Sequence, residues 1–190
     1  VVTQLRGGVE GLLGHKNITL VRGKALFKDQ HTVVVDGEEY SADYIIIATG
    51  SVSASLPIAG ADLPGVITSK EILDIDEVPQ RLCVIGGGVI GLEFASIFRS
   101  FGSEVTVLEY CKDILPRFDT DLAKRLKQSL SKKGIEINTQ AQVTSVAEKS
   151  GEYIVSYTRK GKEESVVADK VLMAVGRRAN IGSLNLSDAG

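Results

Sequence analysis

The chain has 190 residues, 43% of them hydrophobic and 24% charged, which suits one or two globular domains and argues against disorder. The 22 lysines and arginines nearly balance the 24 acidic residues and tryptophan is absent, so neither a basic surface nor stacking platforms for nucleic acid are expected. The apolar runs are too short to cross a membrane and no signal-peptide pattern opens the chain, so we expect a soluble, cytoplasmic protein with no membrane partner.

The first part of the chain combines one helix with short strands. Apolar residues recur at helical spacing over residues 1–13, which predicts a helix. Strand patterns follow, two of them separated by a turn at Asp36 and Gly37, and the predicted strands are residues 18–23, 25–27, 31–35 and 38–40. The apolar run 44–48 predicts a further, buried strand. Residues 51–67 contain two prolines and two glycines, which indicates a connector.

The stretch from Arg81 to Glu109 carries the strongest pattern in the sequence. Residues 82–85 form a short continuous apolar run, which is typical of a parallel strand covered on both faces. Residues 86–91 match G-x-G-x-x-G and lead into an apolar pattern of helical period. A second apolar strand then ends at Glu109. Strand, glycine turn, helix, strand and terminal acid stand in the order that a dinucleotide-binding unit requires.

Each position of the glycine turn has a chemical reason. Gly86 permits the tight turn, Gly88 lets the backbone approach a pyrophosphate, and Gly91 lets the helix pack closely on the strand. The backbone N–H groups of Val89 and Ile90 lie at the positive end of the helix and are expected to hold the phosphates. No lysine is needed for this kind of phosphate site.

Glu109 is expected to select the nucleotide. A carboxylate at this strand end accepts hydrogen bonds from the adenosine ribose hydroxyls and repels a 2′-phosphate, which favours NAD over NADP. Lys112 and Arg117 lie further along and could meet a 2′-phosphate, but neither replaces the acid at the strand end. We therefore expect NAD(H) as the bound nucleotide.

The rest of the chain predicts an α/β fold with a Rossmann-type parallel sheet and an antiparallel three-strand meander. Ser69 is expected to cap a short helix, and Asp119 is expected to cap a longer one that ends at Gly134. Residues 135–137 predict a third parallel strand. The alternating segments predict the meander, and a last apolar run predicts one more buried strand: residues 143–148, 153–159, 164–168 and 171–175.

Residues 42–50 align without gaps to residues 168–176, and each copy predicts a buried strand that ends at a glycine. Chance similarity of two apolar strands is one explanation. We prefer two dinucleotide domains in tandem, the first of them cut short. The chain begins at Val1, not at a methionine, and ends at Gly190 without a terminal element, so we expect a piece of a longer protein.

The sequence offers no catalytic or metal-binding cluster. Cys83 and Cys111 are far apart and form no C-x-x-C pair, so idle or buried thiols are expected. His15 and His31 have no nucleophile or carboxylate at a recognisable spacing and are expected in turns or on the surface. No group of histidines, cysteines and carboxylates has metal-ligand spacing.

Several segments together resemble the pyridine-nucleotide disulfide oxidoreductases, most closely the dihydrolipoamide dehydrogenase branch: residues 46–51, 86–93, 107–109, 114–119 and 174–180. The resemblance covers essentially the whole chain. It implies that residues 1–67 are the rear part of an FAD-binding domain with the crossover, and that residues 68–190 are most of an NAD-binding domain. The FAD glycine fingerprint, the C-x4-C redox pair and the catalytic His-Glu pair of the family are not in this sequence.

The resemblance implies a function for the intact enzyme, a homodimer that oxidises dihydrolipoamide on a lipoyl-bearing protein and passes electrons through FAD to NAD⁺. This chain would carry no catalytic residue and would not bind FAD alone. Gly176 would let the nucleotide lie over the last strand, and Glu93 matches a family glutamate near the nicotinamide, with a solvated helix charge as the alternative. Thr49 and Gly50 match the family's FAD contact.

Other functions stay open at this point. A mercuric reductase, a transhydrogenase or an NADH oxidase of similar architecture would share the same glycine turn. A non-catalytic module that senses NADH and controls a partner protein is an alternative of a different class. Arg177 and Arg178 flank the pyrophosphate, serve on the surface, or contact the domain that is missing from this chain.

Overall fold

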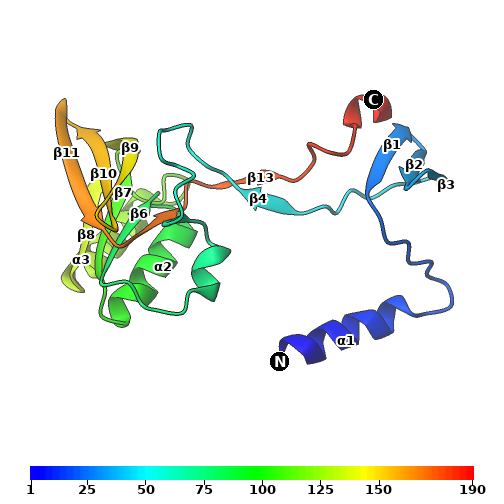
Figure 1. The fold of residues 1–190 in the computed structure, drawn as a ribbon, viewed down its shortest axis with the longest axis horizontal. Helices are drawn as coiled ribbons and strands as arrows, with labels where there is room; N and C mark the ends of the chain where they lie inside the picture. The colour runs from blue at the N-terminus through cyan, green and yellow to red at the C-terminus, as the bar shows by residue number, and fades with distance from the viewer. The chain divides into compact units, whose positions relative to one another are not determined.

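The computed structural model describes residues 1–190, which form two compact units (Figure 1). The larger unit comprises residues 51–178, and the smaller one comprises residues 1–50 together with residues 179–190. The sequence divided the chain at residue 67, whereas the structure groups residues 51–67 with the larger unit and the last twelve residues with the smaller one. Each unit is described by itself below.

Five parallel strands form the centre of the larger unit. Their order is β5-β12-β6-β7-β8, and their bounds are β5 Val66–Ile67, β6 Arg81–Ile85, β7 Glu104–Glu109, β8 Ile135–Thr139 and β12 Lys170–Met173. Ile85 of the central strand β6 pairs with Leu108 on one side and with Met173 on the other, so three strands end level with the glycine turn. The parallel sheet predicted from the sequence is confirmed. Strand β5, together with β4 (Ser51–Ser53), lies inside the predicted connector.

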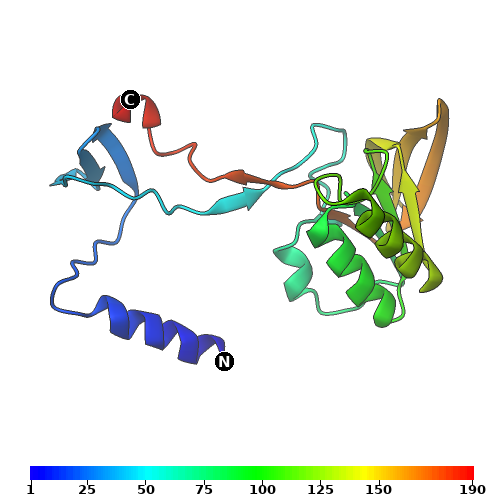
Figure 2. The ribbon, with the colours of Figure 1, turned by 180° about the vertical axis from the view of Figure 1, so that it is seen from behind.

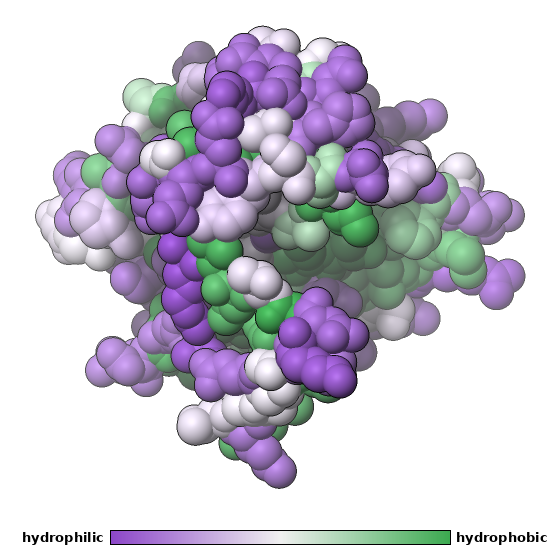
Figure 3. All heavy atoms as spheres, turned by 90° about the vertical axis from the view of Figure 1, so that its right-hand side faces the viewer, coloured by the Kyte–Doolittle hydropathy of each residue, from purple (hydrophilic) through white to green (hydrophobic).

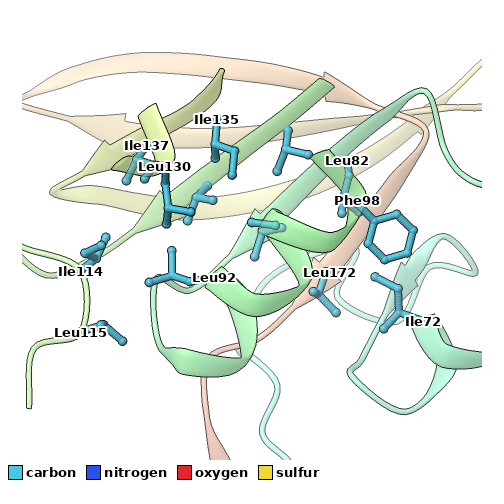
Figure 4. Close-up of a cluster of buried hydrophobic side chains, with 14 of the residues drawn as sticks. Ile72, Leu82, Leu92, Phe98, Ile114, Leu115, Leu130, Ile135, Ile137 and Leu172 are labelled. Carbon is cyan, nitrogen blue, oxygen red and sulfur yellow. The ribbon is translucent and has the colours of Figure 1, made fainter. Parts of the chain in front are cut away.

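Successive side chains of these strands point to opposite faces of the sheet, and each face has its own core. Leu82 and Val84 of β6 pack in a cluster with Leu92 and Phe98 of helix α2 and with Leu130 of helix α3 (Figure 4). The helices span Val89–Ser100 (α2) and Thr120–Lys132 (α3). An apolar strand with both faces covered explains why residues 82–85 show no polar alternation.

The antiparallel meander covers the other face. Cys83 and Ile85 of β6 pack there with Val155 and other side chains of the meander. Figures 1 and 2 show α2 and the meander on opposite sides of the parallel strands. The meander has the order β11-β10-β9, with bounds β9 Ala141–Lys149, β10 Glu152–Arg159 and β11 Lys162–Ala168. The predicted meander is therefore confirmed, with longer strands than the sequence indicated.

The helix ends show which capping predictions hold. The Asp119 carboxylate accepts hydrogen bonds from the N–H groups of Asp121 (2.9 Å) and Leu122 (3.2 Å), which confirms it as the N-cap of α3. The prediction for Ser69 is wrong. The short helix η1 (Glu71–Asp74) has Lys70 at its N-cap without a side-chain bond, and Thr68 donates its N–H and its hydroxyl to Glu71 instead.

The smaller unit contains helix α1 and a three-stranded antiparallel sheet. The elements are α1 Val2–Leu13, β1 Ala25–Asp29, β2 Thr32–Val35, β3 Glu38–Ser41 and the short helix η2 Leu186–Ala189. Asp36 and Gly37 form the predicted turn between β2 and β3, with φ of 50° and 93°. None of the helices of the chain has the length and hydropathy that a membrane crossing requires.

Two predicted strands of the smaller unit do not form. Residues 18–23 and 44–48 have no strand pairing, so the two aligned copies 42–50 and 168–176 differ in structure. Tyr44 and Ile46 are 91% and 88% exposed, although the sequence predicted burial. An apolar run becomes a strand only when a neighbouring strand completes its hydrogen bonds, and no strand of this chain lies beside residues 44–48. Other hydrophobic residues are exposed as well, and Figure 3, a view from the right-hand side of Figure 1, shows such residues in green on the surface.

The Asp119 cap predicts a measurable stability loss. We expect Asp119→Ala to lower the free energy of unfolding by about 1 kcal/mol, because two N–H groups at the start of α3 lose their acceptor. Asp121→Ala is the matched control, since its side chain lies 86% exposed in the first turn and caps nothing. Urea denaturation measures both variants, and equal effects would contradict the capping role.

Candidate functional site

A cleft of about 980 Å³ lies in the larger unit at the carboxyl ends of β6, β7 and β12. The chain moves outward from β6 to β7 and β8 in one direction, while β12 lies on the other side of β6, so the cleft marks the point where the strand order reverses. Open α/β sheets bind their ligands at such points. Six of the predicted site residues line the cleft: Gly86, Gly88, Val89, Ile90, Glu109 and Gly176.

Two glycines of the turn are required by the fold itself. Gly86 has φ +112°, and a Cβ there would clash with the carbonyl group of Ala174, the residue that follows β12. A Cβ at Gly91 would clash with the carbonyl oxygen of Gly86. Gly91 is therefore absent from the cleft wall and acts behind it, where it lets α2 approach β6.

Gly88 is different, because neither a contact within the protein nor its backbone angles require a glycine at this position. Its φ of −78° suits any residue, and no atom of the chain lies within 4 Å of the position that a Cβ would take. Gly88 is also the N-cap of α2 and provides no side-chain cap. The N–H groups of the first helical turn, Val89 and Ile90 among them, therefore lack intrahelical partners at an open cleft. This arrangement suits an anion that approaches the bare backbone.

Glu109 lies at the end of β7 with only 7% of its surface exposed. One carboxylate oxygen accepts a hydrogen bond from the Gly87 N–H (2.5 Å), and the other accepts one from the Cys111 N–H (2.7 Å). The sequence predicted only a ribose contact for this residue. In the structure the side chain also ties the glycine turn to the end of β7, and each oxygen keeps a further lone pair for a hydroxyl donor in the cleft.

The remaining predicted residues lie outside the cleft wall. Glu93 is an exposed residue of α2. Thr49 and Gly50 belong to the smaller unit, where both are exposed and the Gly50 carbonyl accepts a hydrogen bond from the Asn180 N–H (3.0 Å). The contacts of these three residues with cofactors stay predictions.

The sequence did not single out most of the loop residues that complete the wall. All but one lie past a strand end or in the connector, and Val143 belongs to strand β9: Leu56, Pro57, Ile58, Tyr110, Cys111, Pro116, Phe118 and Val143. The ends of the predicted strands could have been used to find most of these cleft residues from the sequence. Arg177 also lines the cleft, and its guanidinium donates to the hydroxyl of Ser51 (2.8 Å) and to its carbonyl oxygen (2.6 Å).

Neither cysteine is activated for chemistry. Cys83 lies in the core with no exposed surface, and burial raises the pKa of its thiol to about 12. Burial and the neighbouring carboxylate of Glu109 raise the pKa of the Cys111 thiol as well. Both thiols are therefore protonated at neutral pH, and the cleft is equipped to bind an anionic ligand, not to attack one.

The two hydrogen bonds of Glu109 predict a stability loss in Glu109→Gln. A glutamine offers one acceptor oxygen and one NH₂ donor, so one of the two backbone N–H groups would face a donor. We expect the free energy of unfolding to fall by about 1–3 kcal/mol. Glu104→Gln, at the exposed start of the same strand, is the control and should change little. Denaturant titration decides, and an unchanged stability of Glu109→Gln would show that these bonds do not hold the turn.

Comparison with known proteins agrees with this geometry. The model of the pyridine nucleotide-disulphide oxidoreductase family matches residues 1–190. The dihydrolipoyl dehydrogenase of Staphylococcus aureus is 41% identical over 194 residues, which cover 100% of this chain and 41% of that protein. The protein of the same name from Acholeplasma laidlawii is 40% identical over 184 residues, which cover 95% of this chain and 54% of that protein.

A solved structure gives the same result. The HOCl-induced flavoprotein disulfide reductase RclA from Escherichia coli matches 100% of this chain and 43% of its own, with a TM-score of 0.87 and 35% identity. The chain thus spans roughly half or less of the length of these relatives. With its glycine turn and cleft at the strand ends, the chain belongs to the pyridine nucleotide-disulphide oxidoreductase family.

Proposed function

We propose that this chain is the NAD-binding segment of a flavin-dependent oxidoreductase of the dihydrolipoyl dehydrogenase type. The observation that carries the proposal is Gly88, a glycine that no contact or backbone angle of the protein requires, at the uncapped start of α2. A pyrophosphate pressed against the backbone would fill the space that a Cβ would otherwise occupy. The identity of about 40% to dihydrolipoyl dehydrogenases supports this choice within the family.

Different residues of the cleft bind different parts of the nucleotide. The N–H groups of Val89 and Ile90 hold the pyrophosphate, and the Glu109 carboxylate accepts the hydroxyls of the adenosine ribose. Gly176, with φ +123° and no atom within 4 Å of a Cβ, leaves room for the nucleotide beyond β12. When bound, FAD and NAD⁺ supply the hydride transfer, and this chain binds and orients the nicotinamide nucleotide.

The assignment extends to the whole enzyme as a set of proposals. Residues 1–67 form the rear of the FAD domain with the crossover, and residues 68–190 form most of the NAD domain. Thr49 and Gly50 are exposed and contact FAD together with parts of the enzyme outside this chain. Glu93 lies near the nicotinamide. The intact enzyme is a cytoplasmic homodimer that takes electrons from dihydrolipoamide on a lipoyl-bearing protein.

The chemistry of the disulfide lies outside this chain. Cys83 is buried in the core and Cys111 lies in the cleft wall, so the two thiols cannot form the redox disulfide of the family. The isolated chain is expected to bind NADH without reducing lipoamide. Lipoamide reduction by the chain alone would contradict this part of the proposal.

Glu109 predicts a preference for NADH over NADPH. A buried carboxylate beside the ribose repels a 2′-phosphate and loses the ribose hydroxyl that it would otherwise accept, which costs about 1–3 kcal/mol, or about 5- to 140-fold in affinity. The fluorescence of the reduced nucleotides measures both affinities without a tryptophan background. Equal dissociation constants at one ionic strength would contradict the role of Glu109 in selection.

Gly88→Ala tests the proposal most directly among single substitutions. The added methyl group meets no atom of the protein, so the variant should still fold, with a stability loss of at most about 1 kcal/mol because alanine is a poorer N-cap than glycine. Because the methyl group occupies the path of the pyrophosphate, NADH affinity should fall by about tenfold or more.

Gly182→Ala is the matched control for that variant. Gly182 also has open space and no positive φ, but it lies in the smaller unit, outside the cleft wall. NADH titration of both variants, with denaturation curves alongside, separates binding from folding. Normal NADH binding by a folded Gly88→Ala variant would contradict the proposed pyrophosphate site at Gly88.

A further inference from the structure

The loop between β7 and α3 contains a strained residue. Leu115 has φ +50°, in the left-handed region, where bulky side chains are rarely found. The other five residues with positive φ, glycines apart, are all polar. Leu115 also precedes Pro116, and a proline favours an extended conformation in the residue before it. Such a conformation persists only where the surrounding structure enforces it, and strained residues of this kind cluster at functional sites.

Packing and backbone hydrogen bonds hold Leu115 in this conformation. Its side chain is 9% exposed and lies in the same core cluster as Ile114 and as Leu92 of α2 (Figure 4). Its carbonyl oxygen accepts a hydrogen bond from the Phe118 N–H (2.9 Å). Its own N–H donates to the carbonyl oxygen of Gly87 (3.0 Å). The strained residue is therefore attached directly to the glycine turn of the cleft.

Both polar groups of the Gly87 backbone are bound within the protein. The carbonyl is held by Leu115, and the N–H donates to Glu109 (2.5 Å). The next N–H along the chain, that of Gly88, has no acceptor in the protein and belongs to a residue of the cleft wall. The peptide bond between the two glycines is trans and planar, so its carbonyl and its N–H point in opposite directions. Fixing the Gly87 carbonyl thus fixes the direction of the Gly88 N–H.

We infer that Leu115 is a positioning residue of the nucleotide cleft. By holding the Gly87 carbonyl, it directs the Gly88 N–H into the cleft. There this group joins the N–H groups of Val89 and Ile90 as a third donor to the pyrophosphate. Successive N–H groups that point the same way form an anion-binding concavity, and donors oriented in advance lower the entropy cost of binding. The contact with pyrophosphate rests on the proposed function, whereas the orientation of the peptide does not.

The test removes the N–H of Leu115 and keeps its side chain. Replacing Leu115 by its α-hydroxy acid analogue turns the N–H into an ester oxygen. The ester also weakens the carbonyl of Ile114 as an acceptor, but that carbonyl accepts no hydrogen bond in the structure. The NADH affinity of the full chain should fall about fivefold or more, because one of the three donors loses its fixed orientation.

Leu184 provides a matched control. It is also a buried leucine, 7% exposed, and its N–H donates to the backbone carbonyl of Ile181 (3.1 Å). It lies in the smaller unit and outside the cleft wall. The same ester at Leu184 removes a comparable hydrogen bond and should leave NADH affinity unchanged. An equal loss of affinity in the two esters would overturn the inference.

NMR spectra measure the orientation itself. In the nucleotide-free chain, the residual dipolar coupling of the Gly88 N–H, compared with those of β6 and β7, should change in the Leu115 ester but not in the Leu184 ester. When NADH is added, the Gly88 amide signal should shift in the parent chain together with those of Val89 and Ile90. In the Leu115 ester the Gly88 shift should be reduced. An unchanged Gly88 coupling in this ester would overturn the inference.

The outcomes separate this inference from the proposed function. If the parent chain binds no NADH while the Gly88 coupling changes in the Leu115 ester, the proposed function is refuted and the orienting role of Leu115 stands. If the parent chain and the Leu115 ester bind NADH equally well, the cleft holds the nucleotide without Leu115 and the inference is wrong.

Discussion

The close approach of α2 to β6 is the constraint on which the rest of the structure depends. It exists because a Cβ at Gly91 would clash with the carbonyl oxygen of Gly86, and a Cβ at Gly86 would clash with Ala174, the residue that follows β12. This contact puts the uncapped start of the helix at the carboxyl ends of three strands that finish level with one another. The open cleft in front of Gly88 follows from that geometry, and so does its suitability for an anion.

Glu109 connects this architecture to the proposed selectivity. Its carboxylate ties the glycine turn to the end of β7 and lines the cleft, so under the proposed function a single side chain would serve both folding and ribose binding. The family match covers residues 1–190 and so includes all residues of the cleft.

Much of the larger unit could be predicted from the sequence because its signals are local. The apolar run 82–85, the glycine spacing, the Asp119 cap and the alternation of the meander each determine a nearby element. The exposed run 44–48 was mispredicted because hydrophobicity does not say whether a partner strand is present. The second role of Glu109 could not be foreseen either, since the donors to its carboxylate are backbone N–H groups, which leave no mark in the sequence.

The central claim is that the backbone at the start of α2 holds a dinucleotide pyrophosphate while Glu109 holds the adenosine ribose. A crystal structure of the chain soaked with NADH measures this directly. Our account predicts density for the pyrophosphate against Gly88, Val89 and Ile90, with the ribose hydroxyls at the Glu109 carboxylate. An empty cleft, or an adenosine bound elsewhere on the chain, would contradict it.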